Sequence, residues 1–375
     1  QLTEDGVRFE RAFSQSSWTA PSMVSLMTGC YLGEERLSLP QELPVIAELF
    51  KDAGYATGAF IHNPIINSDN GFQRGFDDFN CPKVSKHNNP TKGYPAVEPA
   101  AAWIAEHADE STFTYVHYSD PHSPYGPQSE ERQHWMKDPP VLSDELEDHL
   151  RAYKASPPEK LGHLENSIEQ IRVSIAGYND DVVQSDLRIS QIIDCLKENN
   201  LYEDSVIIVT SDHGEGLWTR EGSWNGSHRR QRRMTGKPIS LYNLMKKGHG
   251  IHLHSEQIHV PLILKAPELQ HAVVESAVEG VDIFPTLLEL CDLPRPASIQ
   301  GRSLHLVNPD PIRVDPALTS FPNPIYLRLR ADGELPSDRA LRTHLRVGAG
   351  VSIGVRAAVG AWVRAWVRVR SGGWG

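Results

Sequence analysis

The sequence predicts an α/β fold in which a mixed, largely parallel central sheet is sandwiched by helices. Short apolar segments of strand length alternate along the chain with segments of helical periodicity. One of them, SVIIVT at 205–210, is almost continuously apolar, as expected of a strand covered on both faces. The length of 375 residues fits one large α/β domain, with or without an appendage.

The first half of the chain contains a helix–glycine–strand unit. Residues 43–53 (LPVIAELFKDA) have apolar residues at helical spacing and stop before Gly54. Residues 55–61 (YATGAFI) then have the composition of a strand. A second strand is expected at 113–118 (FTYVHY), and Asp120 and Pro121 are expected to end it.

The second half continues the alternation of helices and strands. Residues 168–199 predict one long helix or two, and strands are expected at 205–210 and 260–264. Asp282 is expected to cap a helix that runs through IFPTLLELC. Residues 124–165 are rich in proline and charge and predict a surface excursion. Chemistry in such sheets collects at the carboxyl ends of the strands.

Composition and charge exclude several classes of protein. Hydrophobic residues make up 39% and charged residues 23%, close to globular averages, which excludes global disorder. No apolar run of about 18 residues occurs, so no membrane span is expected. The net charge of −11 argues against a nucleic-acid partner. The 4 cysteines lie far apart without a CxxC pair, which excludes a zinc ribbon and gives no disulfide framework.

The C-terminal part changes character. Residues 307–336 are expected to be a partial C-terminal segment. Residues 337–375 hold seven arginines, no lysine and one acid, Asp338, with repeated AWVR and VRV pieces. We interpret them as a disordered or out-of-frame tail, and the alternative is a basic amphipathic segment at a membrane surface.

A carboxylate and an imidazole directly follow the apolar strand at 205–210. These are Asp212 and His213, and side chains at such a strand end can reach one metal ion. Oxygen and nitrogen ligands suit Ca²⁺, Mg²⁺, Mn²⁺ or Zn²⁺. The alternative is a turn whose aspartate caps the next helix.

Histidines mark two further segments. His117 and His122 bracket a proline-rich turn in HYSDPHSPY, where a histidine is well placed to donate a proton or contact an anion. His249 lies in GHGIHLHSEQIHVP, a segment with three more histidines. For both segments, structural hydrogen bonding or a surface position is the alternative.

A hydroxyl stands at the start of a helix-like stretch. In SQSSWTAPSMVSLMTG, Thr19 precedes Pro21 by two residues. A hydroxyl there meets unpaired amides and the positive end of the helix dipole, which favour an alkoxide nucleophile and an incoming anion. The alternative is an ordinary Ser/Thr helix cap.

Seven blocks in this order resemble the sulfatase family of the alkaline phosphatase superfamily. They are SSWTAPSMVSLMTG, LPVIAELFKDAGYAT, NGFQRGFDDF, VHYSDPHSPY, IIVTSDHGEG, GHG with EQIHVPLIL, and VDIFPTLLEL with QGRSL. The match covers about residues 1–306. The resemblance implies an alkaline-phosphatase-like sulfatase fold and hydrolysis of small-molecule or glycan sulfate or phosphate esters. It also implies one divalent metal ion, with Ca²⁺ favoured over Mg²⁺, Mn²⁺ or Zn²⁺.

Carried over position by position, the resemblance assigns roles to residues within these blocks. Asp212 and His213 look like metal ligands. His122 looks like the substrate-contacting histidine, and His249 resembles the basic residue that contacts the transferred group. The catalytic candidates are therefore Thr19, His122 and His249, the candidate substrate contacts are Asn63 and His117, and the candidate metal ligands are Asp212 and His213.

Two departures from the family pattern change the expected mechanism. The position that is Cys or Ser in sulfatases, and is oxidised to formylglycine, is Thr19 here, and the expected arginine two residues after the proline is Met23. Formylglycine is therefore not expected. Direct attack by Thr19, as in related phosphodiesterases and phosphotransferases, is the alternative enzyme, and a non-catalytic anion-binding protein is the alternative from another class.

The second departure is at the start of the sequence. The family's first strand, with the remaining metal-binding aspartates, is expected upstream of Gln1. Residues 1–306 are thus expected to form a catalytic domain that lacks its first strand, and this chain alone is expected to bind metal poorly.

A basic insert at 219–248 separates the Asp212 block from the His249 block. One interpretation is a lid for a polyanionic substrate such as a sulfated glycan, and the other is a solvated loop. Its cations are Arg220, Arg229, Arg230, Arg232, Arg233, Lys237, Lys246 and Lys247, against the single acid Glu221.

Overall fold

The computed structural model describes most of residues 2–304 and a short piece of the C-terminal region. The described ranges are 2–32, 37–81, 96–126, 164–221, 245–250, 253–267, 269–304 and 366–368, with a few positions between 134 and 148. Residues 307–336 and most of 337–375 lie outside them.

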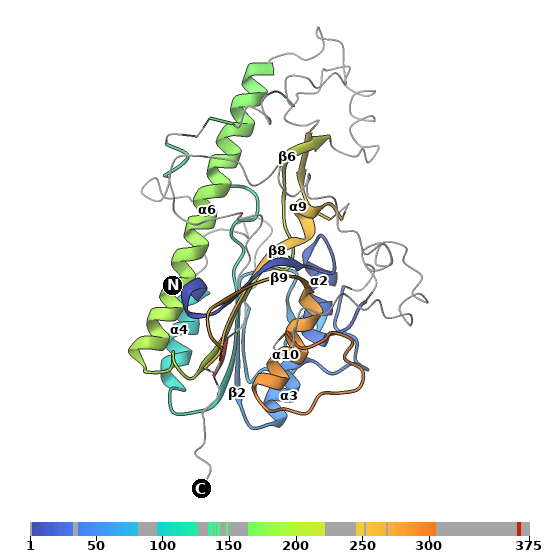
Figure 1. Cartoon of the computed structure of the whole chain (residues 1–375), viewed down its shortest axis with the longest axis vertical. Helices are drawn as coiled ribbons and strands as arrows, with labels where there is room; N and C mark the ends of the chain where they lie inside the picture. The colour runs from blue at the N-terminus through green and yellow to red at the C-terminus, as the bar shows by residue number, and fades with distance from the viewer. Residues whose placement is uncertain are drawn as a thin grey trace.

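An eight-stranded sheet forms the centre of the described structure (Figure 1). Strand pairing shows that six strands point the same way and that only β8 and β10 are reversed. The predicted mixed, largely parallel sheet is confirmed. The strands lie side by side in the order β3 (Asp78–Asn80), β2 (Ala56–Ile61), β4 (Thr112–His117), β10 (Trp366–Arg368), β5 (Ser205–Thr210), β8 (His259–Lys265), β1 (Val7–Phe13) and β9 (Ala272–Glu279).

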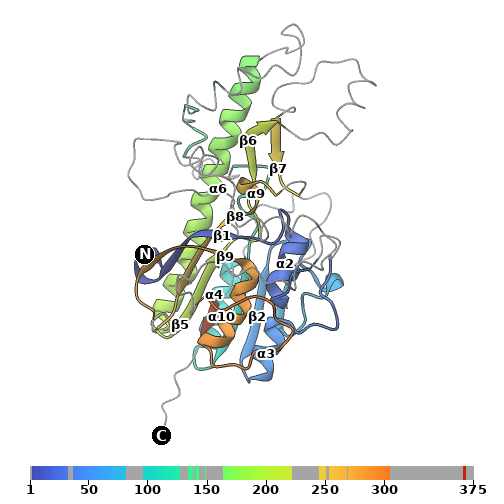
Figure 2. The same cartoon turned by 45° about the vertical axis from the view of Figure 1, so that its right-hand side comes forward.

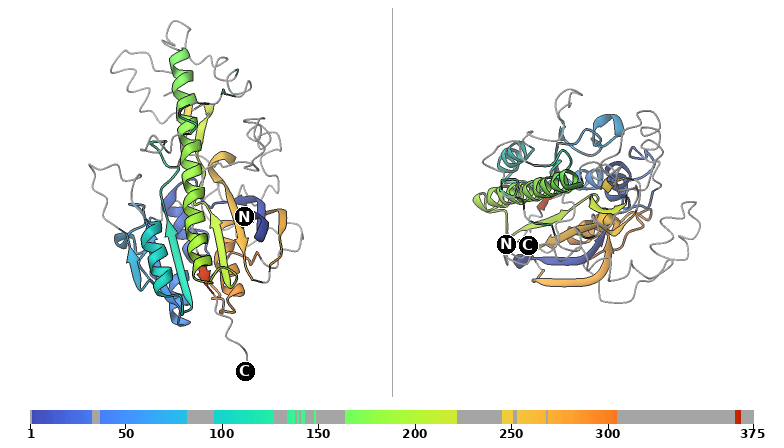
Figure 3. Two further views of the ribbon diagram at one scale, coloured as in Figure 1. Left: turned by 90° about the vertical axis from the view of Figure 1, so that its left-hand side faces the viewer. Right: turned by 90° about the horizontal axis from the view of Figure 1, so that it is seen from above.

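Helices cover both faces of this sheet (Figures 1 and 3). One face carries α2 (Thr19–Thr28), α3 (Ile46–Asp52) and α10 (Ile283–Leu290), and the other carries α4 (Val97–Glu106) and α6 (Leu164–Glu198). The remaining short helices are α1 (Leu2–Asp5), η1 (Ser68–Asn70), α9 (Ser255–Ile258) and η4 (Gly280–Asp282). None of the helices in the described part of the chain has the length and apolar character of a membrane span.

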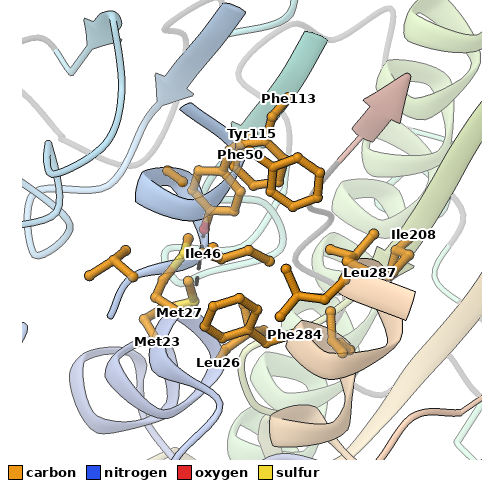
Figure 4. Packing of buried hydrophobic residues seen from close by; sticks show 14 of the residues in the cluster. Met23, Leu26, Met27, Ile46, Phe50, Phe113, Tyr115, Ile208, Phe284 and Leu287 are labelled. Atoms are coloured by element: carbon orange, nitrogen blue, oxygen red, sulfur yellow. Dashed lines mark hydrogen bonds between the residues drawn. The ribbon is translucent and has the colours of Figure 1, made fainter. Parts of the chain in front are cut away.

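Strand β5 shows why two apolar layers form. All six of its residues are buried, and successive side chains point to opposite faces. Val206 and Ile208 join the cluster that contains Phe50 of α3 and Phe284 of α10 (Figure 4). Ile207 and Val209 join the cluster formed with α4 and α6. The continuous apolar run that predicted a doubly covered strand is therefore explained by side-chain alternation.

Helix α6 is one continuous helix of 35 residues, so the alternative of two helices is wrong. Its C-terminal half packs on the sheet through residues such as Ile192 and Leu196. Its N-terminal half extends past the sheet toward β6 (Gly216–Glu221) (Figure 2). There Ile168 and Ile171 pack against Trp218 of β6. The helix thus supports both the sheet and the hairpin that β6 forms with β7 (Met245–Gly248).

Two details differ from the sequence predictions. Part of the tail, Trp366–Arg368, pairs antiparallel with both β4 and β5 as strand β10, since the two strands offer backbone hydrogen-bond partners. Asp282 precedes α10 but does not cap it, because its own backbone is already helical. Its side chain instead accepts hydrogen bonds from the backbone N–H groups of Glu279, at 3.0 Å, and Arg302, at 2.8 Å.

Candidate active site

The candidate residues come from segments that follow parallel strands at one edge of the sheet. Thr19 follows β1, Asn63 follows β2, His122 follows β4, and Asp212 and His213 follow β5. These strands share one direction, so their carboxyl ends meet at the same edge, where the sequence placed the site.

Thr19 is the first residue of α2 and is almost fully buried. The residue before it, Trp18, occupies the cap position, and no side chain caps this helix, so the alternative of a Ser/Thr cap does not hold. The Thr19 Oγ1 atom lies 3.3 Å from Nε2 of His213. The Ser22 hydroxyl donates to the Asp212 carbonyl, which ties the first turn of α2 to the segment after β5.

One ring nitrogen of His213 faces both Thr19 and Asp212. Nδ1 lies 2.8 Å from the carbonyl oxygen of Gly214, so this nitrogen carries the proton that it donates. Nε2 is left as the acceptor, 3.3 Å from Thr19 Oγ1 and 3.5 Å from Asp212 Oδ2. Burial lowers the pKa of His213 to about 4 against the opposing charge of Asp212, so the ring is neutral at pH 7.

These three side chains fit a metal ion in donor type and spacing. Neighbouring ligands of one ion, bound at about 2.0–2.4 Å, lie roughly 3 Å apart, close to the two separations measured from His213 Nε2. A ligating histidine commonly donates its other ring N–H to a carbonyl, as His213 does. Within the described ranges, however, no group of three or more His, Cys, Asp or Glu side chains is placed to hold a metal.

His249 and His122 extend the group around His213. The ring centroid of His249 lies 4.2 Å from that of His213 and 5.3 Å from that of His122. Burial, with the charge of His249, lowers the pKa of His122, and a hydrogen bond to the Ser123 carbonyl opposes this. Thr19, Asp212, His213, His249 and His122 are therefore one contiguous cluster, although they are spread over most of the chain.

Glu215 is a member of this cluster that the sequence analysis missed. Both of its carboxylate oxygens lie 3.3 Å from Nδ1 of His249, and its side chain is only 6% exposed. Burial raises its pKa, but the hydrogen bond and charge of His249 outweigh burial, and the pKa lies below its ordinary value. The sequence feature that could have identified Glu215 is an acid directly after the metal-ligand motif in SDHGEG.

Asn63 and His117 form a second pair. Nδ2 of Asn63 lies 3.2 Å from Nε2 of His117, and Nδ1 of His117 lies 2.9 Å from the Tyr115 hydroxyl. His117 has no exposed surface and uses both ring nitrogens within the protein. Both ring nitrogens of His117 therefore lie within hydrogen-bonding distance of protein groups, and its role as a substrate contact stays a prediction.

Met23 occupies the position at which the family pattern carries arginine. It is fully buried in the apolar cluster between α2 and the sheet, 3.8 Å through its sulfur from the Tyr115 hydroxyl (Figure 4). This position therefore contributes apolar packing and no cation.

The ends of the basic insert adjoin the cluster. Strands β6 and β7 pair antiparallel, and Gly216 stands opposite Gly248. Glu215 and His249 are the residues next to this pair, so the hairpin base brings them together. The cations from 229 to 237, on which the lid interpretation depends, lie outside the described residues.

Comparisons with known proteins show the family of this chain. The family model described as Sulfatase matches residues 1–293. The chain is 23% identical over 372 residues to an ulvan-active sulfatase of Formosa agariphila, with 88% of this chain and 65% of the relative covered. It is 25% identical over 248 residues to arylsulfatase K of Bos taurus, with 60% and 40% covered.

A solved structure gives the same architecture. The phosphonate monoester hydrolase of Agrobacterium radiobacter superposes with a TM-score of 0.58 at 20% identity, with 81% of this chain and 70% of that chain covered. The chain spans about 65% of the length of the ulvan-active sulfatase. The family match over residues 1–293, together with the alkaline-phosphatase-like fold, establishes that this chain belongs to the sulfatase family.

Proposed function

We propose that this protein hydrolyses sulfate or phosphate esters by direct attack of Thr19, with a divalent metal ion held by Asp212 and His213. The proposal rests above all on the 3.3 Å separation between Thr19 Oγ1 and His213 Nε2. It places a buried hydroxyl, at the start of a helix, against a neutral imidazole and a carboxylate.

Each residue has a distinct part in this reaction. The Thr19 oxygen attacks sulfur or phosphorus and displaces the alcohol, which leaves sulfate or phosphate on threonine until water releases it. The N-terminal amides of α2 attract the negative oxygens of the ester. In this proposal His122 and His249 contact those oxygens or protonate the leaving alcohol, and the closeness of their rings to each other and to His213 supports this role. A bound divalent ion would lower the pKa of the hydroxyl and offset charge on the ester.

The nucleophile favours phosphate over sulfate esters. A sulfothreonine lacks the route of collapse that a formylglycine hydrate has, whereas a phosphothreonine can be released by attack of water on phosphorus. The structural likeness to a phosphonate monoester hydrolase is compatible with this preference. A glycan ester is the natural large substrate, because one relative is an ulvan-active sulfatase.

The test compares Thr19→Ala and Thr19→Ser on aryl sulfate, aryl phosphate and bis-aryl phosphate esters, each with Ca²⁺, Mg²⁺, Mn²⁺ or Zn²⁺. Thr28→Ala is the matched control, because Thr28 is buried at the other end of α2, where its hydroxyl donates to the Val24 carbonyl. We expect Thr19→Ala to lose about 10³-fold or more in kcat and Thr19→Ser to retain turnover.

An acid quench during turnover should trap a phosphate or sulfate on Thr19, detectable by mass spectrometry of the peptide. Turnover that survives Thr19→Ala would refute the nucleophile. If metal binds and no ester is turned over, the alternative of a non-catalytic anion-binding protein would gain instead.

A further inference from the structure

The backbone around His249 does not by itself fix the direction of the imidazole. His249 stands between Gly248 and Gly250, whose φ angles are +82° and +90°. It follows the last residue of β7 and belongs to no helix or strand. Because the residue lies in a turn between two left-handed glycines, its ring orientation depends on side-chain contacts.

Glu215 supplies such a contact from a rigid position. Its Oε1 accepts the backbone N–H of Gly216 at 3.0 Å, at the start of β6. Both oxygens are also 3.3 Å from Nδ1 of His249. The opposite pairing of Gly216 and Gly248 in the hairpin sets this spacing through the backbone. The carboxylate is therefore fixed by the strand it adjoins, and the imidazole is fixed by the carboxylate.

The contact selects one ring nitrogen of His249. A carboxylate accepts hydrogen bonds only, so Nδ1 must carry the proton that it shares with Glu215. Nε2 then points away from Glu215 on the other side of the ring. The ring itself lies within the cluster, since its centroid is 4.2 Å from that of His213 and 5.3 Å from that of His122.

We propose that Glu215 is a positioning residue, which keeps the proton on Nδ1 of His249 and thereby turns Nε2 toward the ester over Thr19. Nε2 must itself carry a proton there to contact an ester oxygen or to protonate the leaving alcohol. Glu215 itself touches no reacting atom, and its role rests on the proposed function of His249 as an ester contact. The arrangement resembles in principle a carboxylate that orients a catalytic histidine through the ring nitrogen that does no chemistry.

The first arm of the test reads the tautomer without any substrate. Protein labelled with ¹⁵N in its histidine rings is examined by long-range ¹H–¹⁵N NMR at about pH 9.5. An imidazole with an ordinary pKa near 6.5 is neutral at this pH. His249 is assigned from the signal lost in His249→Gln. We expect Nδ1–H in the wild type and a shift toward Nε2–H in Glu215→Ala.

The second arm measures kinetics on the best aryl ester. We expect Glu215→Ala to lose about 10–100-fold in kcat with KM changed less than about 3-fold. Glu215→Gln should recover part of the loss, because its amide oxygen can still accept from Nδ1–H. The control is Glu48→Gln, which removes a carboxylate of α3 that pairs with Arg74, away from the cluster. It should change neither the tautomer nor kcat.

The outcomes separate this inference from the proposed function. An unchanged His249 tautomer in Glu215→Ala overturns the positioning role, whatever happens to kcat. A tautomer shift with an unchanged kcat overturns it as well, because the orientation then has no bearing on the reaction. A tautomer shift in a protein that turns over no ester supports the positioning contact and counts against the proposed function alone.

Discussion

Gly214→Ala should damage the site through a single methyl group. A Cβ at this position would lie 2.2 Å from the backbone oxygen of Glu256 and 3.1 Å from Cα of Gln257, both in α9. Contacts of carbon with backbone oxygen below 3.0 Å do not persist, so the two segments must separate by about 0.8 Å or more. The Gly214 N–H also donates to the Gln257 carbonyl at 2.7 Å, so this bond must lengthen too.

The displacement falls on the residue next to His213. A misplacement of about 1 Å in a catalytic group can cost 10²-fold in rate, so we expect kcat/KM to fall by about that factor. Overpacking typically costs about 1–3 kcal/mol, so the variant should also be less stable. The assay is kcat/KM on the best ester, together with the free energy of unfolding in urea.

Gly54→Ala separates the loss of activity from the loss of stability. Gly54 has a φ of +86°, and a Cβ there would meet nothing within 4 Å, so the cost is backbone strain of about 1–2 kcal/mol far from the site. We expect this control to lower stability and leave kcat/KM unchanged. If Gly214→Ala also keeps wild-type kcat/KM, the close packing of the segment after β5 on α9 does not position His213.

Two further predictions concern stability. Burial and the charge of Arg188 lower the pKa of His62 to about 4, so the unfolded chain takes up a proton that the folded chain refuses, and stability falls as pH drops from about 6.5 to 4. His62→Gln should flatten this dependence by on the order of 3 kcal/mol, measured by urea unfolding at several pH values. The buried Asp180 carboxylate accepts backbone N–H groups at 134–136, so Asp180→Asn should cost about 2–4 kcal/mol, whereas Asn at the exposed Asp186 on the same helix should cost little.

The sequence predicted which candidate residues lie near one another better than it predicted their contacts. Thr19 and His213 are 194 positions apart, yet each could be placed at the same sheet edge because strands of one direction end together. The contact between Glu215 and His249 could not be found in this way. It depends on the register of β6 with β7 across a long insert, and no local pattern fixes which residues of such a hairpin stand opposite each other.

One expectation failed where tertiary contacts override local preference. Asp282 has the residue type and position of a helix cap, but the 3-10 turn before α10 already gives it a helical backbone. Its carboxylate instead accepts a hydrogen bond from the backbone N–H of Arg302. The strand at Trp366–Arg368 lies in a tail whose composition resembles no core element. Only the backbone groups offered by β4 and β5, far away in sequence, explain its place in the sheet.

The burial of Met23 bears on how the site must balance charge. Met23 and Thr19 lie four residues apart on α2, a spacing that puts side chains on one face of a helix. A long cation at this position would reach toward an ester at Thr19, whereas the methionine packs against Tyr115 in the core. In the proposed reaction, the negative oxygens of the ester would therefore be balanced by a bound metal ion, the amides of α2 and the two histidines. Because His249 is one of these few groups, its orientation by Glu215 should matter more here than at a site with a fixed arginine.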